Sequence, residues 1–447
     1  MTENTTDNLN ITLPHQIRIT EIQTHDIRFP TSLEDLGTDA VHIDCDYSAT
    51  YVKIFTDHPK LVGVGLTFTI GKGNDLCAAC IDFFKPFILN KTIADLENKM
   101  HSIWRQCTNH SQLRWMGPEK GVVHLAVAAL FNGIWDLISK YHDKPLWKYI
   151  IELNTNDLLD KLSFTYLDDA ISRSEAFVIL ENKKRDIAFS KKNIINNGFP
   201  CYTTAAGWLG YSDEKMTKLI KNALANGWTH FKMKVGQDIN RDINRLELVR
   251  KLIGPNNILM IDANQVWSVH ESIEYINKLK KFDLYFVEEP TNPDDILGFR
   301  KIKDAVPEVN LATGEMCQNR IMFKQFLENG SLDFCQIDSC RMASLNEIIP
   351  IMLLASKLNI PLIPHAGGVG LCEYVQHLNI INDLIITSND IRLSEYAESC
   401  AEHIENPAII SNGHYVTPLK AGYSAIIKQK SLEDYSFPSG KYWKSVL

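Results

Sequence analysis

The sequence predicts an α/β protein in which a parallel barrel follows an N-terminal α+β module. Three observations support this prediction. The chain has 447 residues, about three times the length of a typical domain. Between residues 201 and 396, short apolar runs typical of strands alternate with amphipathic helical stretches. No G-x-G-x-x-G motif follows any of these runs, which disfavours an open dinucleotide-binding sheet built from the same units.

Composition and charge exclude several classes of protein. Hydrophobic residues make up 45% of the chain and charged residues 22%, as in ordinary globular proteins. The net charge is -8 and there is no long basic run, so we expect no nucleic-acid partner. The longest apolar stretch, residues 122–135, is interrupted by His124 and Asn132, and no signal-like segment opens the chain. We therefore expect no membrane partner and a cytoplasmic location. The ten scattered cysteines are expected to be reduced thiols.

The N-terminal part of the chain is predicted to contain a tail, then strands and then helices. Residues 1–16 are polar and without periodicity, which is typical of a flexible tail. The segment 24–48 is long, polar and acid-rich, and loops of that length are usually disordered or act as lids; we favour the lid. The module covers residues 17–198, with strand-like runs at 49–57 and 61–70 and helical patterns at 93–110, 119–141 and, more weakly, 150–198.

The barrel is predicted from eight strand-like runs, of which the first seven are each followed by an amphipathic helical stretch. One strand–helix unit occurs about every 25 residues, and eight units favour closure into a (β/α)8-type barrel over an open sheet. The runs are CYTTAAG (201–207), HFKMKV (230–235), ILMIDAN (258–264), LYFVEEP (284–290), VNLATGE (309–315), FCQIDS (334–339), PLIPHAG (361–367) and DIRLSEY (390–396).

Ionisable residues recur at the ends of these runs, one group every 23 to 30 residues from the second run to the seventh. Charges inside apolar strand ends are costly unless they are paired or bound to a metal. The C-terminal rim of such a barrel is also where active sites lie. The residues are Lys232, Lys234, Asp262, Glu288, Glu315, Asp338 and His365.

Three of these residues predict a metal site. Asp262, Glu288 and Glu315 would bring three negative charges together, and all-oxygen ligation favours Mg²⁺ over zinc. Side-chain alternation places Asn264 on the face of Asp262, and it places Glu288 inward while Glu289 points to the other side. The alternative is three unrelated carboxylates in separate salt bridges.

The lysines and the histidine predict acid–base chemistry. Positive charge from the metal and from Lys232 would lower the pKa of Lys234 toward that of a neutral amine base. Asp338 could orient His365 and stabilise its imidazolium form. The alternatives are a solvated K-x-K strand and a core histidine. Together these groups suit removal of a proton beside a metal-bound carboxylate, with Mg²⁺ and Lys232 stabilising the enediolate.

At these residues the chain resembles the enolase superfamily, mandelate racemase branch, and within it the L-fuconate dehydratases. The resemblance runs from about residue 17 to the C-terminus. The stretches that support it include RWMGPEKGV (114–122), GWLGYSDEK (207–215), THFKMKVG (229–236), MIDANQVW (260–267), FVEEPTNPDD (286–295) and HAGGVGLCE (365–373).

The resemblance implies a modified TIM barrel of (β/α)7β form over residues 199–396, with an N-terminal α+β capping domain completed by residues 397–447. It implies metal ligands at Asp262, Glu288 and Glu315 and catalytic residues Lys234, His365, Asp338 and Lys232. Lys232, Asn264 and Glu395 would bind substrate, with Glu398 as the weaker match for the last glutamate.

The predicted function is therefore Mg²⁺-dependent dehydration of a small acid sugar, L-fuconate first, to 2-keto-3-deoxy-L-fuconate by a protein expected to be a homo-oligomer. Lys234 would take the C2 proton and His365 would protonate the departing 3-hydroxyl. One alternative is a dehydratase or racemase of another aldonate or aldarate. The other is a non-catalytic regulatory member of the family.

Overall fold

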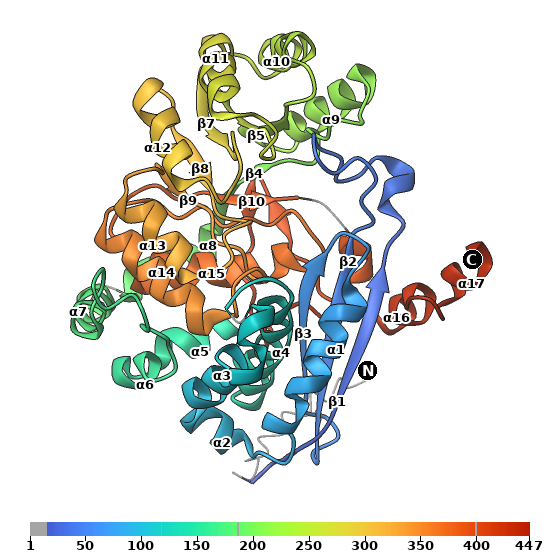
Figure 1. Cartoon of the computed structure of the whole chain (residues 1–447), viewed down its shortest axis with the longest axis vertical. Helices are drawn as coiled ribbons and strands as arrows, with labels where there is room; N and C mark the ends of the chain where they lie inside the picture. Colours follow the sequence, from blue (N-terminus) through green and yellow to red (C-terminus); the bar gives the residue numbers. More distant parts are fainter. Residues whose placement is uncertain (1–15, 118, 186, 398–399) are drawn as a thin grey trace, which may run out of the picture.

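The computed structural model describes residues 16–117, 119–185, 187–397 and 400–447. Figure 1 shows an N-terminal sheet with its helices beside a barrel whose helices form the outer layer. Residues 1–15 of the predicted tail 1–16 and the candidate Glu398 lie outside the described residues.

The cap sheet is antiparallel, with strand order β1-β2-β3. β1 continues through Thr24–Arg28, which pair with residues 48–52 of β2. The prediction that a loop spans 24–48 was therefore wrong at its start, and the loop is residues 29–47. The error arose because β1 is an edge strand rich in polar side chains, most of them only partly buried. The strands are β1 (Ile19–Arg28), β2 (Ser48–Thr56) and β3 (Val62–Thr69).

Among the described residues, eight α-helices lie between the cap sheet and the first barrel strand. The later ones, α5, α7 and α8, contact α15 of the barrel, so this part of residues 17–198 joins the cap to the barrel helices. The helices are α1 (Asn74–Phe84), α2 (Ile93–Asn98), α3 (Met100–Thr108), α4 (Gly121–Tyr141), α5 (Leu146–Glu152), α6 (Thr155–Leu159), α7 (Arg173–Lys184) and α8 (Ile187–Asn197).

Helix α4 is the central helix of the cap. It crosses β3 so closely that a Cβ on Gly65 would lie 2.2 Å from the backbone nitrogen of Gly133, so no side chain fits there. By length and composition α4 could cross a membrane, but 83% of its apolar window is buried inside the protein, as in a core helix. Its polar residues His124 and Asn132 hydrogen-bond to barrel residues.

The barrel has the predicted (β/α)7β form. β4 to β9 pair in sequence order, and β10 pairs with β4. The seventh predicted run forms only an isolated bridge between Leu362 and Cys335, yet Ile363 and His365 donate hydrogen bonds to the β9 side and so continue the wall. The strands are β4 (Phe199–Thr203), β5 (His230–Lys234), β6 (Ile258–Asp262), β7 (Leu284–Glu288), β8 (Leu311–Thr313), β9 (Phe334–Cys335) and β10 (Ser394–Tyr396).

Seven helices connect the barrel strands. Short polar side chains begin several of them: Ser212, Asp238, Ser268 and Asn319 each accept hydrogen bonds from first-turn backbone N–H groups. The helices are α9 (Asp213–Ala225), α10 (Ile239–Ile253), α11 (Val269–Leu279), α12 (Ile296–Ala305), α13 (Arg320–Glu328), α14 (Leu345–Lys357) and α15 (Leu371–Ile385).

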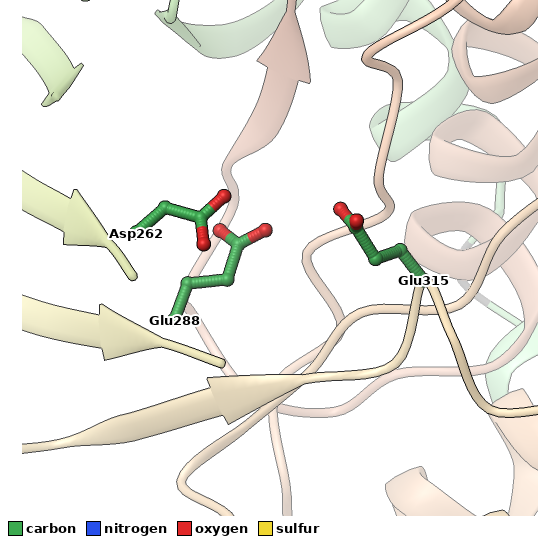
Figure 2. Close-up of side chains that lie close together, drawn as sticks. All are labelled: Asp262, Glu288 and Glu315. Carbon is green, nitrogen blue, oxygen red and sulfur yellow. The ribbon is translucent and has the colours of Figure 1, made fainter. Parts of the chain in front are cut away.

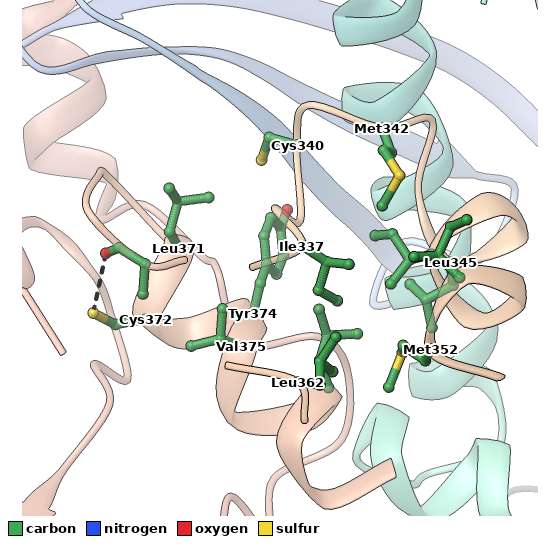
Figure 3. Close-up of a cluster of buried hydrophobic side chains, with 14 of the residues drawn as sticks. Ile337, Cys340, Met342, Leu345, Met352, Leu362, Leu371, Cys372, Tyr374 and Val375 are labelled. Carbon is green, nitrogen blue, oxygen red and sulfur yellow. Dashed lines mark hydrogen bonds between the residues drawn. The ribbon is translucent and has the colours of Figure 1, made fainter. Parts of the chain in front are cut away.

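Two apolar regions hold the barrel together. Outside the strands, Ile337 and Leu362 pack among side chains of α14 and α15 (Figure 3). Inside the barrel, side chains of the strands form a buried apolar layer. The polar residues of the site lie further toward the C-terminal ends of the strands and point into the barrel as well. The inner layer is Tyr202, Met260, Phe286, Ala312, Phe334, Ile363 and Leu393.

The C-terminal segment packs on both parts of the molecule. The short helices α16 (Gln429–Tyr435) and α17 (Lys441–Val446) lie beside the cap, where α16 contacts β1 (Figure 1). The hairpin of β11 (Ile410–Ser411) and β12 (His414–Tyr415) instead extends the barrel sheet, because β12 pairs with Phe199 and Pro200 at the start of β4. The sequence-based prediction was that residues 397–447 complete the cap. The described residues of this segment pack on the barrel as well as on the cap.

Candidate active site

Apart from Glu398, which lies outside the described residues, every residue predicted for the site lies at one rim of the barrel. Lys232 and Lys234 lie in β5, Asp262 and Glu288 end β6 and β7, and Glu395 lies in β10. The others follow the strand ends by a few residues: Asn264 after β6, Glu315 after β8, Asp338 after β9 and His365 after the Leu362 bridge.

Three carboxylates converge at this rim. One oxygen of each of Asp262, Glu288 and Glu315 lies within 4.8 Å of the others. Figure 2 shows Asp262 and Glu288 side by side, with the Glu315 carboxylate facing them across a gap. Glu288 Oε1 is buried and has no hydrogen-bond partner among the described residues. An unpartnered buried oxygen facing two further carboxylates fits a cation held by oxygen ligands.

The two lysines lie on the Asp262 side of the site. Lys232 Nζ is 2.7 Å from Glu288 Oε2 and 2.8 Å from Glu395 Oε1. Lys234 Nζ is 2.5 Å from Asp262 Oδ2. Burial lowers the pKa of Lys234, but the carboxylates of Asp262, Asp39 and Glu315 together outweigh burial and raise it above its ordinary value. The predicted lowering of the Lys234 pKa therefore requires a cation bound to Asp262, whose positive charge would compensate the negative charge of that carboxylate.

The histidine lies on the Glu315 side. His365 Nδ1 is 2.8 Å from Asp338 Oδ2, and His365 Nε2 is 3.1 Å from Glu315 Oε2. The other Asp338 oxygen accepts from the backbone N–H groups of Cys340 and Arg341, which fixes the carboxylate. Asp338 in turn fixes the orientation of the imidazole ring.

The charge around His365 favours its protonated form. Burial alone lowers the pKa of the imidazole, but the carboxylates of Glu315, Asp338 and Glu395 outweigh burial and raise it to about 10. The ring can therefore serve as an acid at neutral pH.

Glu395 and Asn264 complete the rim. Glu395 Oε2 accepts a hydrogen bond from the backbone N–H of Ala366, 2.8 Å away, next to the histidine. Asn264 has a left-handed backbone (φ 44°), and its N–H donates to Asp262 Oδ1. The buried Asn264 Oδ1 has no hydrogen-bond partner among the described residues, and the residue lines the cavity, so it is available to a ligand.

The whole cluster has the charge balance of a divalent-cation site. Five carboxylates face two ammonium groups and one imidazolium ring, so two negative charges remain when all these groups are ionised. Burial and the neighbouring Asp262 raise the pKa of Glu288, because its charged form is poorly compensated. A cation against Glu288 would remove that penalty.

The rim opens into a cavity of about 270 Å³ between barrel and cap. Lys234, Glu315 and His365 form part of its floor. The loop 29–47 and β3 supply the opposite wall with Asp39, His42, Tyr47 and Phe68, among others. A cavity of this size, with convergent polar groups, suits a small polar ligand.

Comparisons with known proteins identify the family of this chain. Residues 215–431 match the family model described as enolase C-terminal domain-like. The solved structure of human mitochondrial enolase superfamily member 1 is 43% identical, with a TM-score of 0.95, and the match covers 96% of this chain and 98% of that one. The chain belongs to the enolase superfamily.

Two further members of the enolase superfamily bear on chemistry. L-galactonate dehydratase from Hypocrea jecorina is 43% identical over 431 residues, covering 95% of each chain. The structure of L-talarate/galactarate dehydratase from Salmonella typhimurium, liganded with Mg and L-lyxarohydroxamate, shares the fold with a TM-score of 0.73 at 20% identity, covering 96% of this chain and 94% of that one.

Sequence reasoning missed several residues of this superfamily site. Gln336 donates to Glu288 Oε2 at 2.8 Å, and alternation from Asp338 could have found it, because the two residues are two apart on one strand run. Arg341 lines the cavity and donates to the backbone oxygen of Glu315. Asp39 and His42 come from a loop without periodicity, so no local pattern indicated them.

Proposed function

We propose that this member of the enolase superfamily is a Mg²⁺-dependent sugar-acid dehydratase, a hydro-lyase, with L-fuconate as its leading substrate. The observation that carries the proposal is the placement of Lys234 and of the His365–Asp338 pair on opposite sides of three convergent carboxylates. A base and an acid that flank one site can remove a proton and protonate a leaving group on adjacent carbons.

Asp262, Glu288 and Glu315 would hold the Mg²⁺. When bound, Mg²⁺ supplies positive charge that stabilises the enediolate formed from the substrate carboxylate. Lys232 adds to this stabilisation, because its ammonium lies between Glu288 and Glu395, at the inner end of the site.

The proton transfers fall to the two flanking groups. Lys234 Nζ accepts the C2 proton, and the electrons of the C–H bond move into the carboxyl group to give the enediolate. Those electrons then return to form the C2=C3 double bond. His365 Nε2 donates its proton to the 3-hydroxyl, the C3–O bond breaks, and water leaves. Asp338 keeps the imidazole ring oriented throughout. The resulting enol becomes the 2-keto-3-deoxy acid.

The choice of substrate rests on resemblance and on one relative. L-fuconate and L-galactonate share the configuration from C2 to C5 and differ only at C6, which is a methyl group in the first and a hydroxymethyl group in the second. The 43% identity with a protein named L-galactonate dehydratase supports L-galactonate as the second candidate. Both substrates place the same bonds at the reacting carbons.

The test is an assay of the purified protein, with Mg²⁺, against a library of acid sugars for 2-keto-acid formation. We expect turnover of L-fuconate, of L-galactonate or of both. Turnover of D-mannonate or galactarate with none of L-fuconate would reject the proposed substrate, and C2 epimerisation without keto acid would identify a racemase instead.

We also propose a cytoplasmic location and a homo-oligomeric state. The human relative is named mitochondrial, so cell fractionation is the relevant test of location. Light scattering of the purified chain tests the oligomeric state.

A further inference from the structure

Glu315 differs from the other two convergent carboxylates in how its backbone is held. Asp262 and Glu288 are the last residues of β6 and β7. Their backbone oxygens accept hydrogen bonds from the N–H groups of Val235 and Ala263, which follow the neighbouring strands. Glu315 instead lies beyond the end of β8, on the loop that leads to α13 (Figure 2). The position of its carboxylate therefore depends on contacts other than strand pairing.

The side chain of Arg341 supplies such a contact. Arg341 lies on the loop of residues 336–344, between β9 and α14, and it lines the cavity. Its Nε donates to the backbone oxygen of Glu315 at 3.0 Å, and its Nη2 is 3.2 Å from Met316 Sδ. One guanidinium group thus holds two consecutive residues of the loop after β8.

The backbone of Arg341 acts on the other side of the histidine. Its N–H donates to Asp338 Oδ1 at 2.7 Å, while Asp338 Oδ2 is 2.8 Å from His365 Nδ1. Glu315 Oε2 is 3.1 Å from His365 Nε2. Arg341 therefore contacts both acidic residues that flank the imidazole ring, Asp338 through its backbone and Glu315 through its side chain.

The cap holds the loop that carries Arg341. Figure 3 shows Cys340 and Met342 of this loop close to the cap strands and helix. Hydrogen bonds from three elements of the cap fix the loop on both sides of Arg341, so its side chain starts from a fixed backbone. These bonds are Cys340 Sγ to Leu66 O of β3 at 3.4 Å, Asn132 Nδ2 of α4 to Ser339 O at 3.1 Å, and Trp104 Nε1 of α3 to Ala343 O at 2.7 Å.

We infer that Arg341 is a positioning residue for the Glu315 carboxylate. By holding the backbone oxygen of Glu315, Arg341 Nε keeps this carboxylate facing Asp262 and Glu288 across the space that a cation would fill. Because cap residues hold the Arg341 loop, the geometry of the cation site in the barrel also depends on the cap. The inference rests on the Mg²⁺ site of the proposed function and concerns how that site is held.

The experiment measures the Mg²⁺ dissociation constant by isothermal titration calorimetry, without substrate, for the wild type and three variants. Arg341→Met places a methyl group at the position of Nε, so it removes both the hydrogen bond and the charge. Arg341→Gln places its amide nitrogen at that position and keeps a donor without the charge. Arg341→Lys keeps the charge but has a methylene group there.

Arg341→Met should weaken Mg²⁺ binding about 10- to 100-fold, which is the usual effect of losing a contact that supports a metal ligand. Arg341→Gln should bind Mg²⁺ nearly as well as the wild type, and Arg341→Lys should bind it more weakly than Arg341→Gln. The value of kcat on the acid sugar should follow the same order. Arg241→Met changes an exposed arginine of α10 and should alter neither quantity.

Wild-type Mg²⁺ affinity in Arg341→Met would overturn the inference. Tighter binding by Arg341→Lys than by Arg341→Gln would also overturn it, because the charge and not the hydrogen bond would then matter. The Tm of each variant in EDTA checks folding, and if Arg341→Met does not fold, the comparison of Arg341→Gln with Arg341→Lys decides.

The titration also separates this inference from the proposed function. If the wild type binds Mg²⁺ but dehydrates no acid sugar, the proposed function fails and the Mg²⁺ affinities of the variants still decide the role of Arg341. If the wild type binds no Mg²⁺, both fail.

Discussion

Glu288 and Glu289 are adjacent, both fully buried, and have different surroundings. Glu288 belongs to the group of three convergent carboxylates. Glu289 turns away through a left-handed backbone (φ 41°), and its carboxylate accepts from Gln265 Nε2 and Thr313 Oγ1. Strand alternation anticipated this difference.

We predict that Glu288→Gln abolishes turnover, with a loss of more than about 100-fold, because it removes a charged ligand and not only a supporting contact. Glu289→Gln should stay within about 10-fold, since an amide can keep one of its two hydrogen bonds. Steady-state kinetics and Mg²⁺ titration of both variants provide the measurement. Equal loss of metal binding in the two variants would contradict the assigned roles.

Several site residues could be predicted because they obey a local rule. Lys232, Asp262 and Glu288 each follow an apolar strand core, and their spacing places them on successive strands of one barrel. Asp39 and His42 obey no such rule, because their position depends on the contact of Thr38 with a loop about 170 residues away. Long-range docking of an irregular loop leaves no periodic signal in the sequence.

At the level of elements, the loop 29–47 forms part of the cavity. Its docking at Gly210 depends on the side-chain oxygen of Thr38. We predict that Thr38→Val raises KM and lowers kcat together, each several-fold, because a loosened lid excludes water less well and positions the substrate less well. Thr38→Ser should retain both values. Wild-type kinetics for Thr38→Val would show that the loop is passive.

A buried ionic cluster joins the cap helix α4 to the barrel helices. Glu347 of α14 is 2.5 Å from His124 Nε2 and 2.9 Å from Arg320 Nη1, and all three side chains are fully buried. Burial raises the pKa of Glu347, but His124 and Arg320 outweigh it and hold that pKa at about 2.

The lowered pKa makes the contribution of Glu347 to stability depend on pH. The contribution is present above the ordinary glutamate value of 4.5 and is lost as pH falls toward 2. Glu347→Gln should destabilise the protein by about 3–5 kcal/mol at pH 7, because it leaves the buried Arg320 guanidinium without this carboxylate partner. Thermal unfolding from pH 7 to pH 3 should show the gap between wild type and variant narrowing. A gap that is constant with pH would contradict the ion pairing.

Two elements departed from the sequence-based prediction for physical reasons. The seventh strand run is continuous with the barrel wall, but it ends in the glycine-rich segment of residues 366–370 and forms only one bridge. The hairpin β11–β12 was missed because two-residue strands are too short for a periodic pattern.

For the molecule as a whole, the two uncompensated negative charges of the site predict that Mg²⁺ stabilises the folded chain. Mg²⁺ at about 100 times its dissociation constant adds about 2.7 kcal/mol to the free energy of unfolding if it binds only the folded state. We expect a higher Tm in Mg²⁺ than in EDTA, and no such difference for Glu288→Gln. The absence of a Mg²⁺ effect on the wild type would favour the non-catalytic alternative.

The arrangement of cap and barrel was predictable because each has its own sequence pattern, strands followed by helices in the first and strict alternation in the second. How residues 397–447 divide between cap and barrel was not predictable, since it depends on which edges and faces the rest of the fold leaves free. On the proposed function, the two sides of the barrel rim have different roles: Lys234 removes the proton and His365 protonates the leaving group.

The roles of Lys234 and His365 are tested by deuterium incorporation at C2 of recovered substrate in D2O, measured together with keto-acid formation on the acid sugar that the wild type dehydrates. His365→Asn should lose about 10²–10⁴ in dehydration rate and retain exchange at C2, whereas Lys234→Ala should lose both reactions, because Lys234 takes the proton. If His365→Asn loses exchange while Lys234→Ala keeps it, the histidine is the base and the assigned roles are reversed.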